Sequence, residues 1–267
     1  MTKDLLATRE FTPGAAETIV FLHSSNTAGW MWGEQVPAFG DHHLLVPDLP
    51  GYGDNNDREW LSLADSADHV ARLIERRAAG GTAHIVGLSL GSSVALELAR
   101  RHPERVTTLF LASANIAKPG RALVWGGRAL LTLWNSPGYW NATGRSYGLA
   151  GEDLDLFVKT GAGIRKQTAQ RVLAEVTRGV SPDALTAVSA PLVAIAGGKD
   201  AAFISRDSLR LLAEILPNAR TAIAPGLHHQ WNIEDVPLFN AAVREWLTSR
   251  SLAGGLEPGP VGAATGR

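Results

Sequence analysis

The chain has 267 residues, of which 45% are hydrophobic and 19% charged, a composition typical of globular proteins rather than disordered ones. Its formal net charge of −1 argues against nucleic acid or an anionic membrane as the main partner. Because it has no cysteine, disulfides, thiolate metal sites and a cysteine nucleophile are excluded. No stretch has the character of a signal peptide or a membrane-spanning segment, so we expect a cytoplasmic protein.

Short apolar runs alternate with helical patterns along most of the chain. Buried strands are expected at residues 18–24, 43–49, 84–89, 106–114, 191–198 and 221–226. Helices are expected from Ser62, which begins a capping box, and over residues 91–102, 205–216 and 237–247. This alternation predicts an α/β fold, with a mostly parallel sheet covered by helices on both faces.

Two segments break the alternation. Residues 116–181 contain helical patterns and no strand signal, so we expect a helical cap inserted in a core formed by 1–115 and 182–250. Residues 251–267 are rich in Gly, Pro and Ala, and we expect them to form a flexible tail.

A G-x-S-x-G pattern, GLSLG at 87–91, lies where an expected strand runs directly into an expected helix. In this context the pattern is typical of a nucleophile elbow, a strained turn that exposes the serine hydroxyl. Ser89 is therefore the candidate nucleophile. The alternative is a helix-capping serine in a tight turn.

A serine hydroxyl needs a base to remove its proton, and that base is usually a histidine held by a carboxylate. Asp200 follows the expected strand 191–198, and His228 and His229 follow the strand 221–226. Such groups collect beyond the carboxyl ends of parallel strands. The order Ser, Asp, His along the chain is the order associated with this elbow.

Together these segments resemble the α/β-hydrolase fold family over about residues 5–250, most closely its cap-bearing lipase-like and esterase-like members. FLHSSNTAGWMW (21–32) resembles the family's H-G-x-x-x-x-S-x-x-W loop, and PDLPGYGDN (47–55) resembles its D-x-x-G-x-G loop. The family pattern G-H, four residues, E-x-P places the base at His229, five residues before Glu234.

The resemblance also bears on the other polar residues near the expected site. His228 stands where the family has glycine, and is either a hydrogen-bonded neighbour or a polar contact to substrate. Some family members supply the acid after the strand that follows the elbow. This chain has Asn115 there, which favours Asp200 as the acid.

Two backbone N–H groups are expected to bind the oxyanion. One belongs to Leu90, directly after the nucleophile, and the resemblance implies that the other belongs to Ser25. Ser24 replaces the glycine of the family loop and is a candidate substrate contact. The resemblance implies that His23 and Asp48 fix loop backbone.

Trp125, Trp134, Trp140 and Trp231 lie in the cap or just after the expected base, where they could line a substrate pocket. The alternative is ordinary packing of apolar helices on the core. No metal-ligand or nucleotide-binding pattern is present, so we expect no metal and no cofactor.

The sequence thus predicts a metal-free serine hydrolase that acts on an ester of a small-to-medium apolar substrate. A thioester, lactone or carbon–carbon bond next to a ketone suits the same groups, as does a non-hydrolytic lyase or cyclase reaction. A ligand-sensing role on this scaffold is the remaining alternative. The expected partner is a small molecule, and the sequence gives no indication of the oligomeric state.

Overall fold

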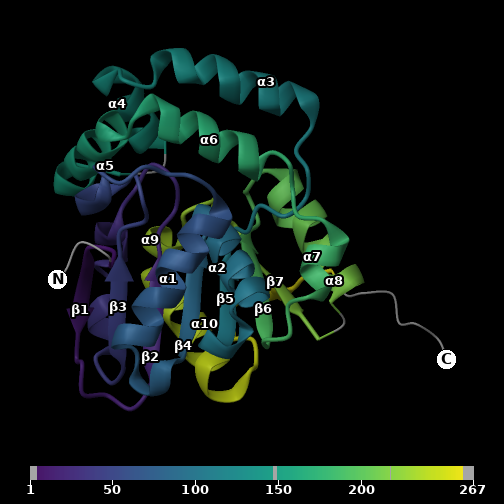
Figure 1. Ribbon diagram of the computed structural model, residues 1–267. Helices are drawn as coiled ribbons and strands as arrows, with labels where there is room; N and C mark the ends of the chain where they lie inside the picture. Colours follow the sequence, from purple (N-terminus) through teal and green to yellow (C-terminus); the bar gives the residue numbers. More distant parts are fainter. Residues whose placement is uncertain (1–4, 147–148, 217, 261–267) are drawn as a thin grey trace.

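The computed structural model describes residues 5–146, 149–216 and 218–260 (Figure 1). Its centre is an eight-stranded sheet in the order β1-β3-β2-β4-β5-β6-β7-β8. The six inner strands are parallel, whereas β1 and β8 are antiparallel and form the edges. The strands are β1 (Thr8–Phe11), β2 (Thr18–Leu22), β3 (His43–Pro47), β4 (Ala83–Leu88), β5 (Val106–Ala112), β6 (Leu192–Gly197), β7 (Arg220–Ala224) and β8 (Glu257–Pro258). The predicted mostly parallel sheet is confirmed.

Helices join these strands, and the first of them begins where the sequence predicts. The Ser62 hydroxyl accepts the N–H of Asp65 at 3.0 Å and caps α1. No helix in the described part of the chain is both long and apolar enough to cross a bilayer. The α-helices are α1 (Leu63–Arg77), α2 (Leu90–Arg101), α3 (Arg121–Leu130), α4 (Pro137–Ser146), α5 (Gly151–Gly163), α6 (Lys166–Val176), α7 (Pro182–Thr186), α8 (Leu209–Ile215), α9 (Trp231–Glu234) and α10 (Val236–Ser249).

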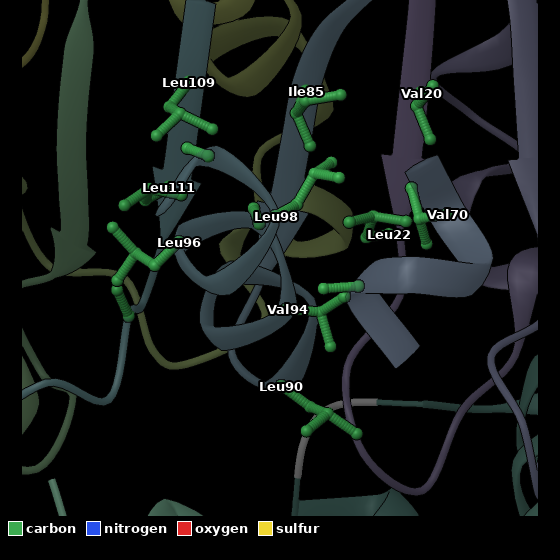
Figure 2. Close-up of a cluster of buried hydrophobic side chains, with 14 of the residues drawn as sticks. Val20, Leu22, Val70, Ile85, Leu90, Val94, Leu96, Leu98, Leu109 and Leu111 are labelled. Carbon is green, nitrogen blue, oxygen red and sulfur yellow. The ribbon is translucent and has the colours of Figure 1, made fainter. Parts of the chain in front are cut away.

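The sheet is buried on both faces, as its continuous apolar strands require. On one face, α2 packs Leu90, Val94 and Leu98 toward side chains of the central strands, including Leu22 and Ile85 (Figure 2). On the other face, Phe239 and Trp246 of α10 belong to a second buried cluster. Because successive residues of β2 alternate between the two clusters, the central strands hold both helical layers in place.

Helices α3–α6 form an insertion between β5 and β6, and Figure 1 shows them lying together at one end of the sheet. No strand lies among the described residues of 116–181. The insertion has its own buried cluster, made of Trp140, Leu149, Leu154 and Phe157. It is also hydrogen-bonded to core loops, for example from Trp30 Nε1 to Thr160 Oγ1 at 3.0 Å.

The two edge strands come from segments where no strand is predicted. Residues 251–260, part of the segment expected to be flexible, lie against the core. There β8 pairs with β7, and the N–H of Gly259 donates to the Thr221 carbonyl at 3.0 Å. Leu252 and Leu256 pack on the cluster that contains Trp246, so this part of the segment covers the edge of the sheet. The remainder, 261–267, lies outside the described residues.

Candidate active site

Ser89 lies in a strained turn between β4 and α2. Its φ of 54° and ψ of −108° are rare for a residue with a side chain and cost about 1–3 kcal/mol. The surrounding hydrogen bonds hold this conformation: the N–H of Ser89 donates to the Ala112 carbonyl at 2.9 Å, and the Ser92 hydroxyl donates to the Gly87 carbonyl at 2.8 Å. The segment therefore has the backbone of a nucleophile elbow.

The two glycines of the elbow allow backbone segments to pack directly on one another. A Cβ on Gly87 would lie 2.6 Å from the carbonyl carbon of Gly91. A Cβ on Gly91 would clash with the Leu22 carbonyl oxygen and lie 2.9 Å from that of His23. Neither contact leaves space for a methyl group, so glycine at both positions permits the close approach of α2 to the end of β2.

His229 and Asp200 meet on neighbouring loops at the carboxyl edge of the sheet. His229 Nδ1 lies 2.8 Å from Asp200 Oδ2. The Asp200 side chain is 5% exposed and that of His229 is 23% exposed. Because an ionised carboxylate only accepts hydrogen bonds, Nδ1 carries the proton and Nε2 is the basic nitrogen. Of the two candidate acids, it is Asp200 that contacts this histidine.

The loop that carries His229 is also tied to β5, the strand between those that end at Ser89 and Asp200. The Ser113 hydroxyl donates to the His229 carbonyl at 2.8 Å, and the N–H of Ser113 donates to the Ile195 carbonyl at the same distance. Sequence reasoning missed Ser113 because it examined the end of this strand only for an acidic side chain. The Ser113 hydroxyl therefore holds the main chain of His229.

The two expected oxyanion donors come from elements that pack against each other. Leu90 is the first residue of α2, where backbone N–H groups have no partner within the helix. Ser25 lies in the loop after β2, and the contacts of Gly91 hold the backbone before it against the start of α2. The helix dipole adds positive potential at this end.

Ser24 is buried, and its hydroxyl bonds within its own loop. Ser24 Oγ lies 3.1 Å from the Ser25 carbonyl oxygen and 3.1 Å from Thr27 Oγ1. The N–H of Ser24 donates to Met31 Sδ at 3.3 Å. These contacts tie Ser24 into its own loop, whereas the sequence predicts a contact to substrate.

His23 and Asp48 hold the loops beside Ser25. His23 Nε2 accepts the N–H of Leu49 at 2.9 Å, so Nδ1 carries the proton and donates to the Ser24 carbonyl at 2.8 Å. Burial lowers the pKa of His23 and outweighs the opposing effect of Asp48. Asp48 accepts the N–H of Gly29 at 2.6 Å. Both residues fix loop backbone, as the resemblance implies.

His228 turns away from this cluster and pairs with Glu234. Its N–H donates to Glu234 Oε2 at 2.7 Å, and its Nδ1 lies 2.8 Å from Oε1. Burial alone would raise the pKa of Glu234, but the hydrogen bonds from His228 outweigh it and hold this pKa below its ordinary value. The two adjacent histidines therefore bind different carboxylates. In the sequence, Glu234 served only to locate His229. Its contact with His228 was not predicted.

The four tryptophans expected near a pocket occupy different environments. Trp231 is fully buried below α9, 4.6 Å between ring centroids from Phe239, so it belongs to the core on the α10 face rather than to a pocket. Trp140 is fully buried in the insertion and donates to the Trp134 carbonyl at 2.6 Å. Trp125 is 68% exposed on α3. Packing within the core or the insertion thus accounts for the positions of Trp231 and Trp140.

The insertion's cluster also contacts two segments of the core. Trp30, in the loop that carries Ser25, packs against it, and so does Ile233, four residues after His229. Trp134 contacts both this cluster and that of the core. The loop that carries Ser25 and the segment that follows His229 therefore contact the same apolar cluster.

A cavity of about 690 Å³ lies to one side, between β1, the loop after β3 and α5. Trp30, Asp48 and Lys159 are among its lining residues, whereas none of Ser89, Asp200 and His229 lines it. Within the residues that the structure describes, no three His, Asp or Glu side chains are grouped so that they could hold a metal ion.

Comparison with known proteins places this architecture in a family. Residues 19–243 match the model of the alpha/beta hydrolase family. An AB hydrolase superfamily protein of Gibberella zeae is 27% identical over 96% of this chain and 89% of its own length. A hydrolase from Pseudomonas aeruginosa superposes with a TM-score of 0.76, at 24% identity, over 91% of this chain and 94% of its own.

A pimeloyl-[acyl-carrier protein] methyl ester esterase of Methylococcus capsulatus is 34% identical over 46% of each chain. Because the family model covers most of the sequence, the chain belongs to the alpha/beta hydrolase family. The predicted fold family and the prediction of a hydrolase are confirmed.

Proposed function

We propose that this protein is a serine esterase in which Ser89 is the nucleophile, His229 the general base and Asp200 the residue that orients the base. The hydrogen bond of 2.8 Å between His229 and Asp200, at the same sheet edge as the strained elbow of Ser89, carries the proposal. Such a pairing fixes the imidazole tautomer and stabilises the imidazolium formed during attack.

The reaction follows from these groups. His229 Nε2 takes the proton of the Ser89 hydroxyl while Oγ attacks the ester carbonyl. The N–H groups of Leu90 and Ser25 stabilise the oxyanion, and loss of one such donor costs about 3 kcal/mol in related sites. His229 then protonates the leaving alcohol, and a water activated by the same residue releases the acid and regenerates Ser89.

The surroundings favour an apolar ester of small-to-medium size. The insertion's cluster of Trp140, Leu149, Leu154 and Phe157 packs on Trp30, in the loop that carries Ser25, and on Ile233, four residues after His229. An apolar cluster of this kind favours substrates with an apolar acyl or alcohol group. The methyl ester esterase among the relatives supports an ester over the other bonds that the triad suits.

Covalent labelling by a fluorophosphonate, read as intact mass, tests the nucleophile and the base. We expect one adduct on the wild type, none on Ser89→Ala, and at least about 100-fold slower labelling of His229→Ala. His228→Ala is the matched control because the adjacent imidazole binds Glu234 instead. The assignment of Ser89 is wrong if the wild type is not labelled or if Ser89→Ala is. Equal slowing of both histidine variants would contradict the assignment of His229.

A chain-length series of p-nitrophenyl esters tests the substrate class separately. We expect kcat/KM to rise from acetate to medium-length acyl groups, since each buried methylene contributes about 0.8 kcal/mol. If the protein is labelled but hydrolyses none of these esters, the nucleophile stands and the ester class does not. Thioesters and lactones are then the substrates to compare.

A further inference from the structure

The outer face of α3 and the following turn, η6 (Leu131–Leu133), carries large apolar side chains that the fold leaves exposed. No described residue of α3 is buried. The exposed side chains are Leu123 at 51%, Trp125 at 68%, Leu130 at 46% and Leu133 at 50%. Leu123 and Leu130 are seven residues apart and so share one face of the helix. We call these four residues the α3 surface; an apolar group of this kind marks an interaction site.

The segment around the α3 surface is strongly basic. Residues 116–151 contain no acidic residue and four cationic ones, namely Lys118, Arg121, Arg128 and Arg145. The whole insertion, 116–181, has nine lysines and arginines against four acidic residues, whereas the rest of the chain has sixteen against twenty-two. The near-zero net charge of the chain therefore hides a positive insertion on a negative core.

Two cationic residues of the insertion line a groove beside the α3 surface. Arg128 and Lys166 line a groove of about 390 Å³ between α3, η6 and α6, with Leu131 and Leu173 among its other residues. Two cations above apolar side chains suit a phosphate group attached to an acyl chain.

We propose that the α3 surface docks on an anionic phospholipid bilayer, with its apolar side chains in the interfacial region and a lipid phosphate in the Arg128–Lys166 groove. A short helix that exposes Leu and Trp side chains and carries arginines suits the plane of such an interface. A second copy of the chain fits less well, because an isologous contact through this surface would bring two positively charged insertions together.

Flotation of the full-length protein with vesicles tests the proposal. We expect binding to vesicles of phosphatidylcholine with phosphatidylglycerol, and much weaker binding to phosphatidylcholine alone. Arg121→Gln/Arg128→Gln should lower the partition coefficient about 25-fold, since each cation near an anionic surface contributes roughly fivefold. Leu123→Gln/Leu130→Gln should lower it about tenfold for each leucine removed from the interface.

Matched controls come from the core. Leu61→Gln removes a leucine that is 55% exposed, and Arg210→Gln removes an exposed arginine of α8; neither should change binding. Ser89→Ala should bind vesicles like the wild type, which separates this surface from the proposed hydrolysis. Circular dichroism verifies that every variant is folded.

Three outcomes would overturn the proposal: no binding of the wild type to anionic vesicles, binding that both α3 double variants retain, or self-association that only the leucine variant abolishes. Glycerol 3-phosphate in the same assay distinguishes a lipid from a free phosphate. We expect it to displace little protein from the vesicles, because it offers the headgroup chemistry without the apolar interface. If it stabilises the protein against heating while vesicles do not bind, the ligand is a free phosphate and the lipid assignment is wrong.

Discussion

Gly91→Ala tests whether close packing of backbone on backbone positions the elbow. The added Cβ would clash with the Leu22 carbonyl oxygen and lie 2.6 Å from the Leu22 carbonyl carbon and 2.9 Å from the His23 carbonyl oxygen. All three are backbone atoms, which cannot rotate out of the way as a flexible side chain does. The start of α2 must therefore move away from the end of β2.

Two magnitudes follow from this clash. Overpacking of a close-packed interior costs about 1–3 kcal/mol of unfolding free energy. Movement of α2 separates the N–H of Leu90 from that of Ser25, and a displacement of about 1 Å lowers turnover by about 100-fold. Since both donors act on the oxyanion, which forms only in the transition state, we expect kcat to fall while KM changes little.

The assay combines urea denaturation with steady-state hydrolysis of a p-nitrophenyl ester. Gly126→Ala is the matched control, because it makes the same substitution within α3 at a position with no atom within 4 Å of the new Cβ. It should stabilise the protein by up to about 1 kcal/mol and leave kcat unchanged. If Gly91→Ala keeps the wild-type kcat, the contact between α2 and the end of β2 does not position the donors, and the reasoning fails.

Three further predictions follow from individual contacts. Glu234→Gln should lower kcat by about tenfold or more with little change in KM, because Glu234 holds the loop that carries His229. Asp68→Asn should destabilise the fold at neutral pH by about 1 kcal/mol in urea denaturation, because the hydrogen bond from Arg101 lowers the pKa of Asp68 to about 2. Acidification from pH 7 to pH 5 should lower the unfolding free energy of the wild type more than that of His23→Gln, since burial lowers the pKa of His23.

For Asp68 and His23, the direction of the pKa shift fixes how the unfolding free energy changes with pH. Asp68 has a lowered folded pKa, so its contribution is present above the unfolded pKa of about 4 and disappears as the pH falls toward 2. A cost for Asp68→Asn that persists at pH 3 in full would contradict the ion-pair explanation. His23 also has a lowered folded pKa, so the unfolded chain takes up its proton first, with a slope of up to about 1.4 kcal/mol per pH unit. Equal slopes for wild type and His23→Gln would exclude His23 as the source.

For Glu234→Gln the comparison is with His228→Ala, which removes the imidazole contact and keeps the backbone N–H that Glu234 also accepts. A smaller loss in His228→Ala than in Glu234→Gln supports a positioning role. Equal losses would place the effect in the imidazole of His228 itself.

The positions of the three candidate residues at strand ends could be predicted because the relevant signals are local. Ser89, Asp200 and His229 each follow a strand that is recognisable by its apolar run, and parallel strands bring their carboxyl ends to one edge. The edge strands lacked such a signal. β1 has a mostly half-buried pattern and pairs with β3 alone, and β8 has two exposed residues whose place depends on contacts with β7.

The environments of the tryptophans were not predictable from their neighbours in the sequence. Trp231 follows His229 by two residues, yet at the start of α9 its ring packs against Phe110 and Phe239 in the core. Trp140 packs inside the insertion because α4 and α5 need a core of their own. The direction in which a tryptophan side chain points depends on where its helix begins and on what the helix packs against. Neither can be read from the two residues on each side of it.

Net charge is a weak guide to a local surface for a related reason, since a sum over the chain carries no information about position. Exposed charges interact over about 8 Å at physiological ionic strength, so a bilayer in contact with α3 responds to Arg121 and Arg128 and hardly to the acidic core. Vesicle binding and ester hydrolysis should therefore differ in their dependence on salt. Added NaCl should weaken vesicle binding, which depends on those cations, whereas kcat/KM for a neutral p-nitrophenyl ester should stay constant. A parallel fall in both would mean that salt acts on the fold as a whole, and the assignment of binding to the basic insertion would fail.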